Sequence, residues 1–302
     1  MREKMVHLIA HSHILAILAV VLATLCWAGE NLVANQMSVE GIPPIALSFW
    51  RWTLAFLILF SFTGKKLIQQ RKEIFQGRYQ LLALGFLGIF CANTLLYIAA
   101  ESTQAVTLAL IEMILPVITM ILAVPLLHVF PKKRQLLGMG MAIPGLLTIL
   151  SKGEWSMLVS LDFGRGDMIM FLAMCCWGLY TVLLKRFELP LSEAQLLTTL
   201  IGIGAMFLLP FYLWEPVSER SLSISLDALY VIIYEVLFAT LVAYLSWNFG
   251  VSVLGPSTAA MFHFLIPVFS AMLAIPILGQ TLYQFHLIGA GLIFTGLWIS
   301  NR

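Results

Sequence analysis

Five ionisable side chains lie inside long apolar runs of the sequence, where they could bind a charged solute or carry protons. They are Glu30, Arg51, Glu112, Glu235 and His263. An ionised group is costly inside a lipid bilayer, so residues of this kind mark functional sites by default. At a rise of about 1.5 Å per residue, the three carboxylates and Arg51 share one layer, roughly 20 to 24 Å from one edge of their expected helices. His263 lies about 9 Å from that edge.

Glu30 and Arg51 are close in depth and belong to consecutive runs, so we expect an ion pair between them. Either the pair is a buried structural ion pair that joins two helices, or Arg51 is free to bind a substrate carboxylate. Together with Glu112 and Glu235, the layer holds two acidic groups in excess if all four are ionised. Because burial disfavours such an excess of charge, the layer suits either a proton relay or a site for a cationic amine.

Glu112 and His263 each lie four residues before a proline, Pro116 and Pro267 respectively. A proline cannot donate a hydrogen bond to the carbonyl four residues earlier, so each ionisable residue is expected to have a free backbone carbonyl. An acidic side chain beside a free carbonyl could coordinate the ammonium group of a substrate. Alternatively, neighbours satisfy the freed carbonyl in an ordinary kinked helix, and His263 is a packing residue.

Polar and aromatic residues are expected to complete this region. Asn93 and Tyr97 share a helix face, and 151 positions later Tyr244 and Asn248 repeat the pair in reverse order. Such a face could bind a polar substrate or join two helices, and nearby aromatic rings could stack on an organic ring or cation. The predicted substrate-binding residues are Trp27, Glu30, Asn31, Asn93, Tyr97, Glu112, Trp177, Tyr180, Tyr244 and His263, and the predicted proton or charge network is Glu30, Arg51, Glu112 and Glu235.

The composition identifies the medium around these residues. Of 302 residues, 61% are hydrophobic and only 11% are charged, against about 45–50% and 25% in a soluble domain. The chain is therefore predicted to be an all-α integral membrane protein, which excludes a soluble enzyme, a nucleic-acid-binding protein and a disordered scaffold. The net charge of +2 indicates no acidic partner.

Ten segments are long and apolar enough to cross a bilayer, which needs about 20 residues. They are residues 13–36, 44–63, 80–100, 104–127, 134–151, 167–185, 193–214, 228–250, 257–279 and 284–301. The N-terminus, alternate loops and the last residue carry 13 of the 17 Lys and Arg residues, while the opposite side carries three. Since basic residues are retained in the cytoplasm, both termini are predicted to be cytoplasmic.

The chain also repeats itself. IEMILPVITMILAVPLL at 111–127 matches FHFLIPVFSAMLAIPIL at 262–278, an offset of 151, and Cys26-Trp27 recurs as Cys176-Trp177 at an offset of 150. Each half, 1–151 and 152–302, has five expected spans, so two copies joined in sequence must insert in opposite orientations. Inverted repeats are the architecture of alternating-access transporters. A duplication retained only for stability is the alternative.

Several other residues are assigned to packing or anchoring. Gly138, Gly140, Gly145 and their repeats Gly289, Gly291 and Gly296 would let helices approach closely. Tryptophans near the ends of the expected spans would be interfacial anchors, namely Trp50, Trp52, Trp155 and Trp214. The four cysteines lack the spacing of a metal site or a disulfide framework and are expected to be packing residues.

WAGENLVAN at 27–35, GIPP at 41–44 and SFWRW at 48–52 resemble the opening of the drug/metabolite transporter superfamily, specifically the EamA-type ten-helix exporters. The proline pattern of 111–127 and its repeat also fit, so the resemblance covers nearly the whole chain. It implies two inverted five-helix repeats around a central cavity lined mainly by spans 1, 3, 4, 6, 8 and 9. Relatives move amino acids, nucleosides, drugs or other metabolites, usually outward. One departure is Glu30, which precedes Asn31 where the family commonly has a Ser-Asn or Asn-Phe pair.

We therefore expect a secondary transporter of small organic solutes, most simply an amino-acid or metabolite exporter of the bacterial inner membrane, with or without proton coupling. The alternatives are an importer or exchanger of a nucleoside-type or cationic metabolite, and a solute channel. Catalytic motifs and an ATP-binding motif are absent from the sequence, so no enzyme activity is expected. The expected partners are the solute, protons if coupled, and the lipid bilayer. No cofactor, metal, nucleic acid or obligate protein partner is expected.

Overall fold

A computed structural model describes residues 12–30, 44–100, 102–103, 105–154, 156–159, 164–214, 226–279 and 281–301. These residues form a bundle of helices with short connections, and no strand occurs among them. The first helix is Ser12–Glu30. The others are α2 (Pro44–Gln69), α3 (Arg71–Gln76), α4 (Arg78–Leu84), α5 (Ala92–Ala100), α6 (Ala105–Glu112), α7 (Leu115–Leu127), α8 (Lys133–Leu150), α9 (Ser156–Val159), α10 (Arg165–Arg186), α11 (Glu193–Trp214), α12 (Leu226–Tyr234), α13 (Ala243–Leu254), α14 (Pro256–Met261), α15 (Leu265–Leu278) and α16 (Gln284–Asn301).

Eight helical stretches in the described part of the chain are long and apolar enough to cross a membrane. They coincide with eight of the ten predicted spans. The other two predicted spans are α8 and α16, which are helical but have only 18 residues each. Polar residues at their ends, such as Lys133 and Arg134 in α8 and Gln284 in α16, shorten the apolar part of each helix.

Two of the spanning stretches contain π-helical segments, in which each turn holds an additional residue. One segment is Gly85–Cys91, between α4 and α5, and the other is Glu235–Val242, between α12 and α13. A shift of 151 positions carries the first segment onto Val236–Val242, so the two occupy corresponding places in the sequence repeat. π-Helical turns leave the regular α-helical hydrogen bonding and are frequent at functional sites.

The fourth and ninth predicted spans are interrupted close to Pro116 and Pro267. α6 ends at Glu112 and α7 begins at Leu115, with Pro116 in its first turn. In the second half, a 3-10 turn at Phe262–Phe264 separates α14 from α15. A kinked but continuous helix with one free carbonyl was expected at each place. Instead, a new α-helix begins one residue before Pro116 and two residues before Pro267.

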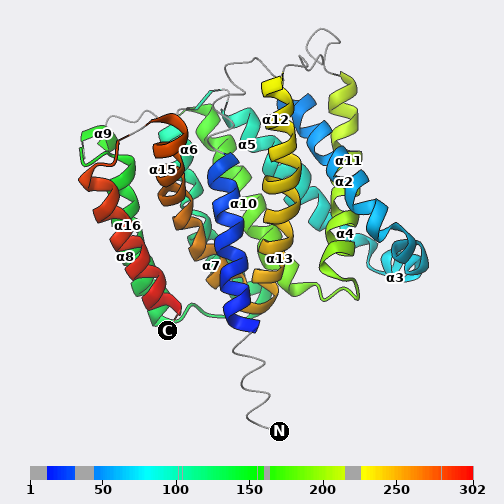
Figure 1. The fold of residues 1–302 in the computed structure, drawn as a ribbon. Coiled ribbons are helices and arrows are strands. Elements are labelled where there is room, and N and C mark those ends of the chain that lie inside the picture. The colour runs from blue at the N-terminus through cyan, green and yellow to red at the C-terminus, as the bar shows by residue number, and fades with distance from the viewer. Residues whose placement is uncertain are drawn as a thin grey trace.

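α8 and α16 form a close antiparallel pair at one side of the bundle (Figure 1). A Cβ atom on Gly138 would collide with the carbonyl oxygen of Gly296, and one on Gly145 would lie 2.7 Å from the carbonyl oxygen of Gly289. These four glycines therefore have the predicted packing role. Gly140 and Gly291 do not, since nothing lies within 4 Å of a Cβ atom at either position.

The tryptophans predicted to be interfacial anchors differ in their exposure. Trp214 is 91% exposed and Trp50 is partly exposed, as expected for residues near the ends of spans. Trp52 is fully buried, so its assignment as an anchor was wrong. It follows Arg51 in α2, and its ring packs under the Arg51 guanidinium, whose Cζ lies 5.1 Å from the ring centroid. Trp155 lies outside the described residues.

Candidate substrate and charge site

Arg51 is the centre of a buried charge cluster. Its side chain is 1% exposed, and its Nη1 atom lies 2.6 Å from Oε1 of Glu30 and 2.8 Å from Oε2 of Glu235. The same nitrogen donates to the hydroxyl of Tyr97 at 2.6 Å. The two N–H groups of Nη1 donate hydrogen bonds to Glu30 and Tyr97. Glu235 therefore interacts with Arg51 through the attraction of opposite charges, without a hydrogen bond. The ion pair predicted between Glu30 and Arg51 is present, and Glu235 joins it.

The remaining guanidinium nitrogens of Arg51 bind the second π-helical segment. Nε donates to Oγ1 of Thr240 at 2.6 Å, and Nη2 donates to the carbonyl of Ala239 at 3.2 Å. Arg51 thus links α2 to residues of the Ser12–Glu30 helix, the third span and the eighth span. Glu30 remains 19% exposed while Glu235 is 1% exposed. Two carboxylates therefore share one cation, which leaves an excess negative charge if both are ionised.

The π-helical segments supply backbone acceptors to this centre. Gly88 and Ala239 are separated by 151 positions, and the carbonyl of each accepts side-chain hydrogen bonds. Gly88 accepts from Asn93 at 2.8 Å, while Ala239 accepts from the indole of Trp27 at 3.2 Å and from Arg51. Each π-helical segment therefore presents a backbone carbonyl to side chains, at corresponding places in the sequence repeat.

The asparagine and tyrosine residues predicted to share a helix face take part in two separate hydrogen bonds between helices. Nδ2 of Asn93 donates to the hydroxyl of Tyr244 at 2.9 Å, and the hydroxyl of Tyr180 donates to Oδ1 of Asn248 at 2.8 Å. Tyr97 instead accepts from Arg51. Nδ2 of the buried Asn248 has no hydrogen-bond partner among the described residues.

Aromatic rings pack beside these polar groups. The Trp27 ring contacts Trp177 at 5.6 Å, Tyr244 at 6.0 Å and Trp247 at 5.4 Å between centroids. His263 joins them, 5.4 Å from Trp27 and 4.9 Å from Trp247. Trp177 also stacks on Tyr180 at 5.0 Å. These residues bring the first, sixth, eighth and ninth predicted spans together.

Glu112 is the predicted site residue that the charge cluster does not include. It is half-buried at the end of α6, and no ion pair joins it to another residue within the part of the chain that the structure describes. Ion pairs thus join three of the four residues of the predicted network, while Glu112 interacts with Glu30 only through the repulsion of like charges. Its counterpart His263 is half-buried, and its Nδ1 atom has no partner among the described residues. Asn31 lies outside the described residues.

Four residues of the site were not predicted: Trp52, Ala239, Thr240 and Trp247. Trp247 follows Tyr244 by three positions and so lies on the same helix face, which the sequence could have indicated. Thr240 and Ala239 meet Arg51 because of the π-helical segment, for which the apolar sequence has no signal. Across the described residues, no group of three His, Cys, Asp or Glu residues is arranged to hold a metal ion.

The residues related to this cluster by the sequence repeat do not form a second charged cluster. The residues that correspond to Glu30, Glu235 and Tyr97 are Tyr180, Leu84 and Asn248. Tyr180 and Asn248 bind each other through neutral groups, and Leu84 is fully buried. The site is thus similar in backbone geometry on its two sides but charged on only one.

Membrane-length helices that converge on a buried centre of charged, polar and aromatic side chains are characteristic of integral membrane transport proteins. Residues 14–151 and 164–302 each match the EamA-like transporter family. The chain belongs to this family of membrane transporters, within the drug/metabolite transporter superfamily, and it is not an enzyme.

Individual relatives agree with this assignment. The chain is 30% identical to the uncharacterized transporter YyaM of Bacillus subtilis (strain 168), over 91% of this chain and 90% of YyaM. It is 22% identical to a protein of Salmonella typhimurium named "Probable amino-acid metabolite efflux pump", over 95% of this chain and 93% of that protein. A crystal structure with 16% sequence identity shares the fold, with a TM-score of 0.75 over 94% of both chains.

Proposed function

We propose that the protein is a secondary transporter in which two inverted five-helix halves, 1–151 and 152–302, alternately open a central site to either face of the membrane. In this proposal α8 and α16 are the fifth and tenth spans. The observation that carries it is the correspondence between the halves. Two separate stretches match the same family, and the π-helical segments and helix interruptions recur at the spacing of the sequence repeat.

Contacts between corresponding residues support an approximate two-fold axis through the site. Asn93 and Tyr244 are 151 positions apart and are hydrogen-bonded to each other. Trp27 and Trp177 correspond in the repeat and are in ring contact. Residues related by a two-fold axis touch each other only near that axis. Substrate sites of inverted-repeat transporters lie at the interface between repeats, near interrupted helices.

The substrate that suits this centre is a small organic solute with an amino group, such as an amino acid or a related metabolite. The aromatic rings of Trp27, Trp177 and Tyr244 provide apolar and cation-binding surface. Glu112 carries an acidic group outside the Arg51 cluster and is available for an ammonium group or a proton. The name of the Salmonella relative supports efflux as the direction.

Coupling to protons is supported by the arrangement of Glu30 and Glu235. Both carboxyl groups contact the same nitrogen of Arg51, so they lie side by side. Two neighbouring carboxyl groups can hold one proton between them. Glu30 is partly exposed and Glu235 is buried, so Glu30 would be the group that exchanges this proton with water or with the solute.

Both termini are proposed to be cytoplasmic, with the protein in the bacterial inner membrane. The first described helix begins, and α16 ends, at the same end of the bundle (Figure 1). α3, which follows the C-terminal end of α2, lies toward that end (Figure 1). Lys65 and Lys66 belong to the last turns of α2 and Arg71 begins α3, which fits the retention of basic residues in the cytoplasm.

The direct experiment is flux in proteoliposomes with a panel of labelled amino acids, nucleosides and organic cations, with and without a pH gradient. We expect saturable flux of an amino-acid-like solute, with counterflow when unlabelled solute is loaded inside. Flux that neither saturates nor shows counterflow would indicate a channel. Single cysteines at Glu154 and Arg186 would test orientation, and labelling of both from the same side would contradict the inverted arrangement.

A further inference from the structure

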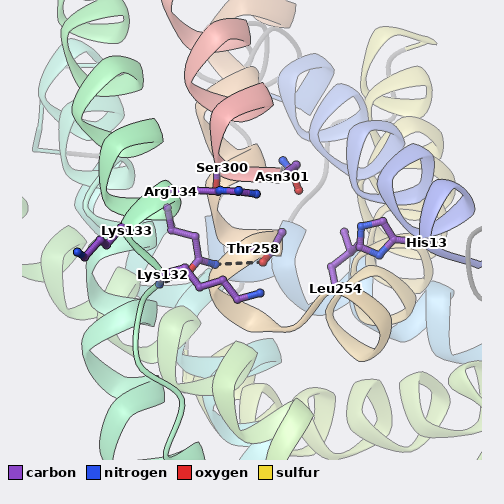
Figure 2. Close-up of a pocket in the computed structure, with 9 residues that line it drawn as sticks. His13, Lys132, Lys133, Arg134, Leu254, Thr258, Ser300 and Asn301 are labelled. Atoms are coloured by element: carbon purple, nitrogen blue, oxygen red, sulfur yellow. Dashed lines mark hydrogen bonds between the residues drawn. The ribbon is translucent and has the colours of Figure 1, made fainter.

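A cavity of about 400 Å³ lies apart from the central site, at the end of the bundle where α8 begins and α16 ends. Its walls come from the first helix, α8, the junction of α13 with α14, and α16. Figure 2 shows His13 and Leu254 on one side of this group and the start of α8 on the other. The central charge cluster contributes no residue to this cavity.

The cavity is lined by basic residues without acidic ones. Lys132, Lys133 and Arg134 all belong to its lining, and no Asp or Glu does. The ion pairs in the described part of the chain involve only Arg51, so Lys132 and Arg134 have no acidic partner there. In Figure 2, Lys132 extends toward Thr258 and Leu254, while Lys133 turns away from them. Lys132 and Arg134 thus place two uncompensated positive charges at one cavity.

Neutral donors are placed in the same cavity. Ser300 is 8% exposed, and its hydroxyl has no hydrogen-bond partner among the described residues. An unsatisfied buried hydroxyl is unfavourable unless a ligand or water satisfies it. Gln135 is also buried, and its side chain is fixed because Oε1 accepts from the backbone of Lys132 at 2.9 Å and Nε2 donates to Thr258 at 3.2 Å. These bonds hold the start of α8, whose free N–H groups favour an anion.

We propose that this cavity binds a phosphate group, held by Lys132, Arg134 and the hydroxyl of Ser300. A phosphate group carries several acceptor oxygens and can use both cations and the hydroxyl together. It could belong to the headgroup of an anionic phospholipid or to a soluble phosphorylated molecule. The position at the end of the bundle favours a lipid, because basic pockets between membrane helices at this level bind lipid headgroups.

The test is thermal unfolding of the purified full-length protein in detergent, titrated separately with inorganic phosphate, phosphatidylglycerol and phosphatidylcholine. We expect phosphatidylglycerol to raise the unfolding midpoint more than phosphatidylcholine does. The double variant K132Q/R134Q should lower the apparent affinity at least tenfold, and S300A should lower it severalfold. Lys133→Gln is the matched control, since it removes one neighbouring positive charge that points elsewhere.

The titrations with different ligands distinguish a lipid headgroup from a soluble phosphate compound. A shift with phosphatidylglycerol alone assigns a lipid headgroup, whereas an equal shift with inorganic phosphate assigns a soluble phosphate compound. The proposal is overturned if neither ligand raises the midpoint beyond the effect of phosphatidylcholine. It is also overturned if K133Q weakens binding as much as K132Q/R134Q, because the effect would then be one of general surface charge. These measurements involve no flux, so they are independent of the proposed transport function.

Discussion

Asn93 donates a hydrogen bond to the hydroxyl of Tyr244, 2.9 Å away, and these two residues correspond to each other in the sequence repeat. The bond therefore joins equivalent positions of the two halves, and Asn93 also donates to the carbonyl that the first π-helical segment exposes. The bond links the backbone geometry of one half to a side chain of the other.

This bond should produce measurable coupling between its two residues. We expect Asn93→Ala and Tyr244→Phe each to destabilise the protein, and the double variant to lose less than the sum. A coupling energy of about 0.6 to 1.7 kcal/mol is expected for a polar contact between membrane helices. Chemical unfolding of the four proteins in one detergent measures it, and strictly additive losses would show that the bond contributes nothing.

Replacement of Arg51 should be the most destabilising change in the charge cluster. Arg51→Gln leaves two carboxyl groups without a cation in a buried site, so we expect a loss of about 3–5 kcal/mol. Arg78→Gln is the control, because Arg78 lies in the first turn of α4 and is half-buried. Its guanidinium donates to the carbonyl of Phe75 and the hydroxyl of Tyr79 and takes part in no ion pair among the described residues. The thermal unfolding midpoints of the two variants are compared. Equal midpoints would contradict the prediction that the charge cluster stabilises the fold.

The two carboxylates of the cluster should be partly interchangeable. Glu30→Gln or Glu235→Gln alone leaves one carboxylate for Arg51, so each single variant should lose less stability than the double variant E30Q/E235Q. Flux measured with and without a pH gradient then tests proton coupling, which should be weakened in both single variants. If either single variant is as unstable as the double variant, the carboxyl groups do not share the cation.

Glu112 should affect transport without affecting folding. It takes no part in the ion pairs of the described residues, so Glu112→Gln should change the free energy of unfolding by less than about 0.5 kcal/mol. We expect solute flux to fall at least tenfold or to lose its dependence on pH. Glu154→Gln, at an exposed position, is the matched control. Unchanged flux and an unchanged pH profile in E112Q would exclude the assigned role.

The contact between α8 and α16 gives a prediction about packing alone. Gly138→Ala places a methyl group against the Gly296 carbonyl and should cost about 1–3 kcal/mol through overpacking. Gly140→Ala, two residues away, meets open space and should be tolerated. Unfolding curves of the two variants decide the matter, and equal losses would mean that the helices do not approach closely in the membrane.

The positions of charged residues along their helices could be predicted from the sequence, but the rotation of each helix about its axis could not. The apolar runs located the helices, and the shared layer predicted that Glu30 would meet Arg51. Lipid and protein interior are both apolar, so a spanning helix shows little contrast between its faces. For this reason the interfacial position predicted for Trp52 is wrong, since it is buried, and the sequence did not indicate that Glu112 would make no ion pair with Arg51.

The remaining differences arise where the helices depart from regular geometry. The π-helical segment at Glu235–Val242 brings the Ala239 carbonyl and Thr240 to Arg51, and nothing in its apolar residues distinguishes it from an α-helix. The prolines at 116 and 267 indicated an irregularity but not that the helix would end and begin again. Side chains near such irregularities point in directions that regular periodicity does not predict.

The occurrence of one charged cluster, without a repeat-related second one, has an energetic consequence. The positions that correspond to Glu30 and Glu235 are occupied by the uncharged residues Tyr180 and Leu84. Two halves with identical side chains would make the inward-open and outward-open forms equal in free energy. If the halves exchange their packing as proposed, the hydration of only one charged cluster changes. One of the two forms is then expected to have the lower free energy without solute, and a bound solute or proton would have to offset that difference.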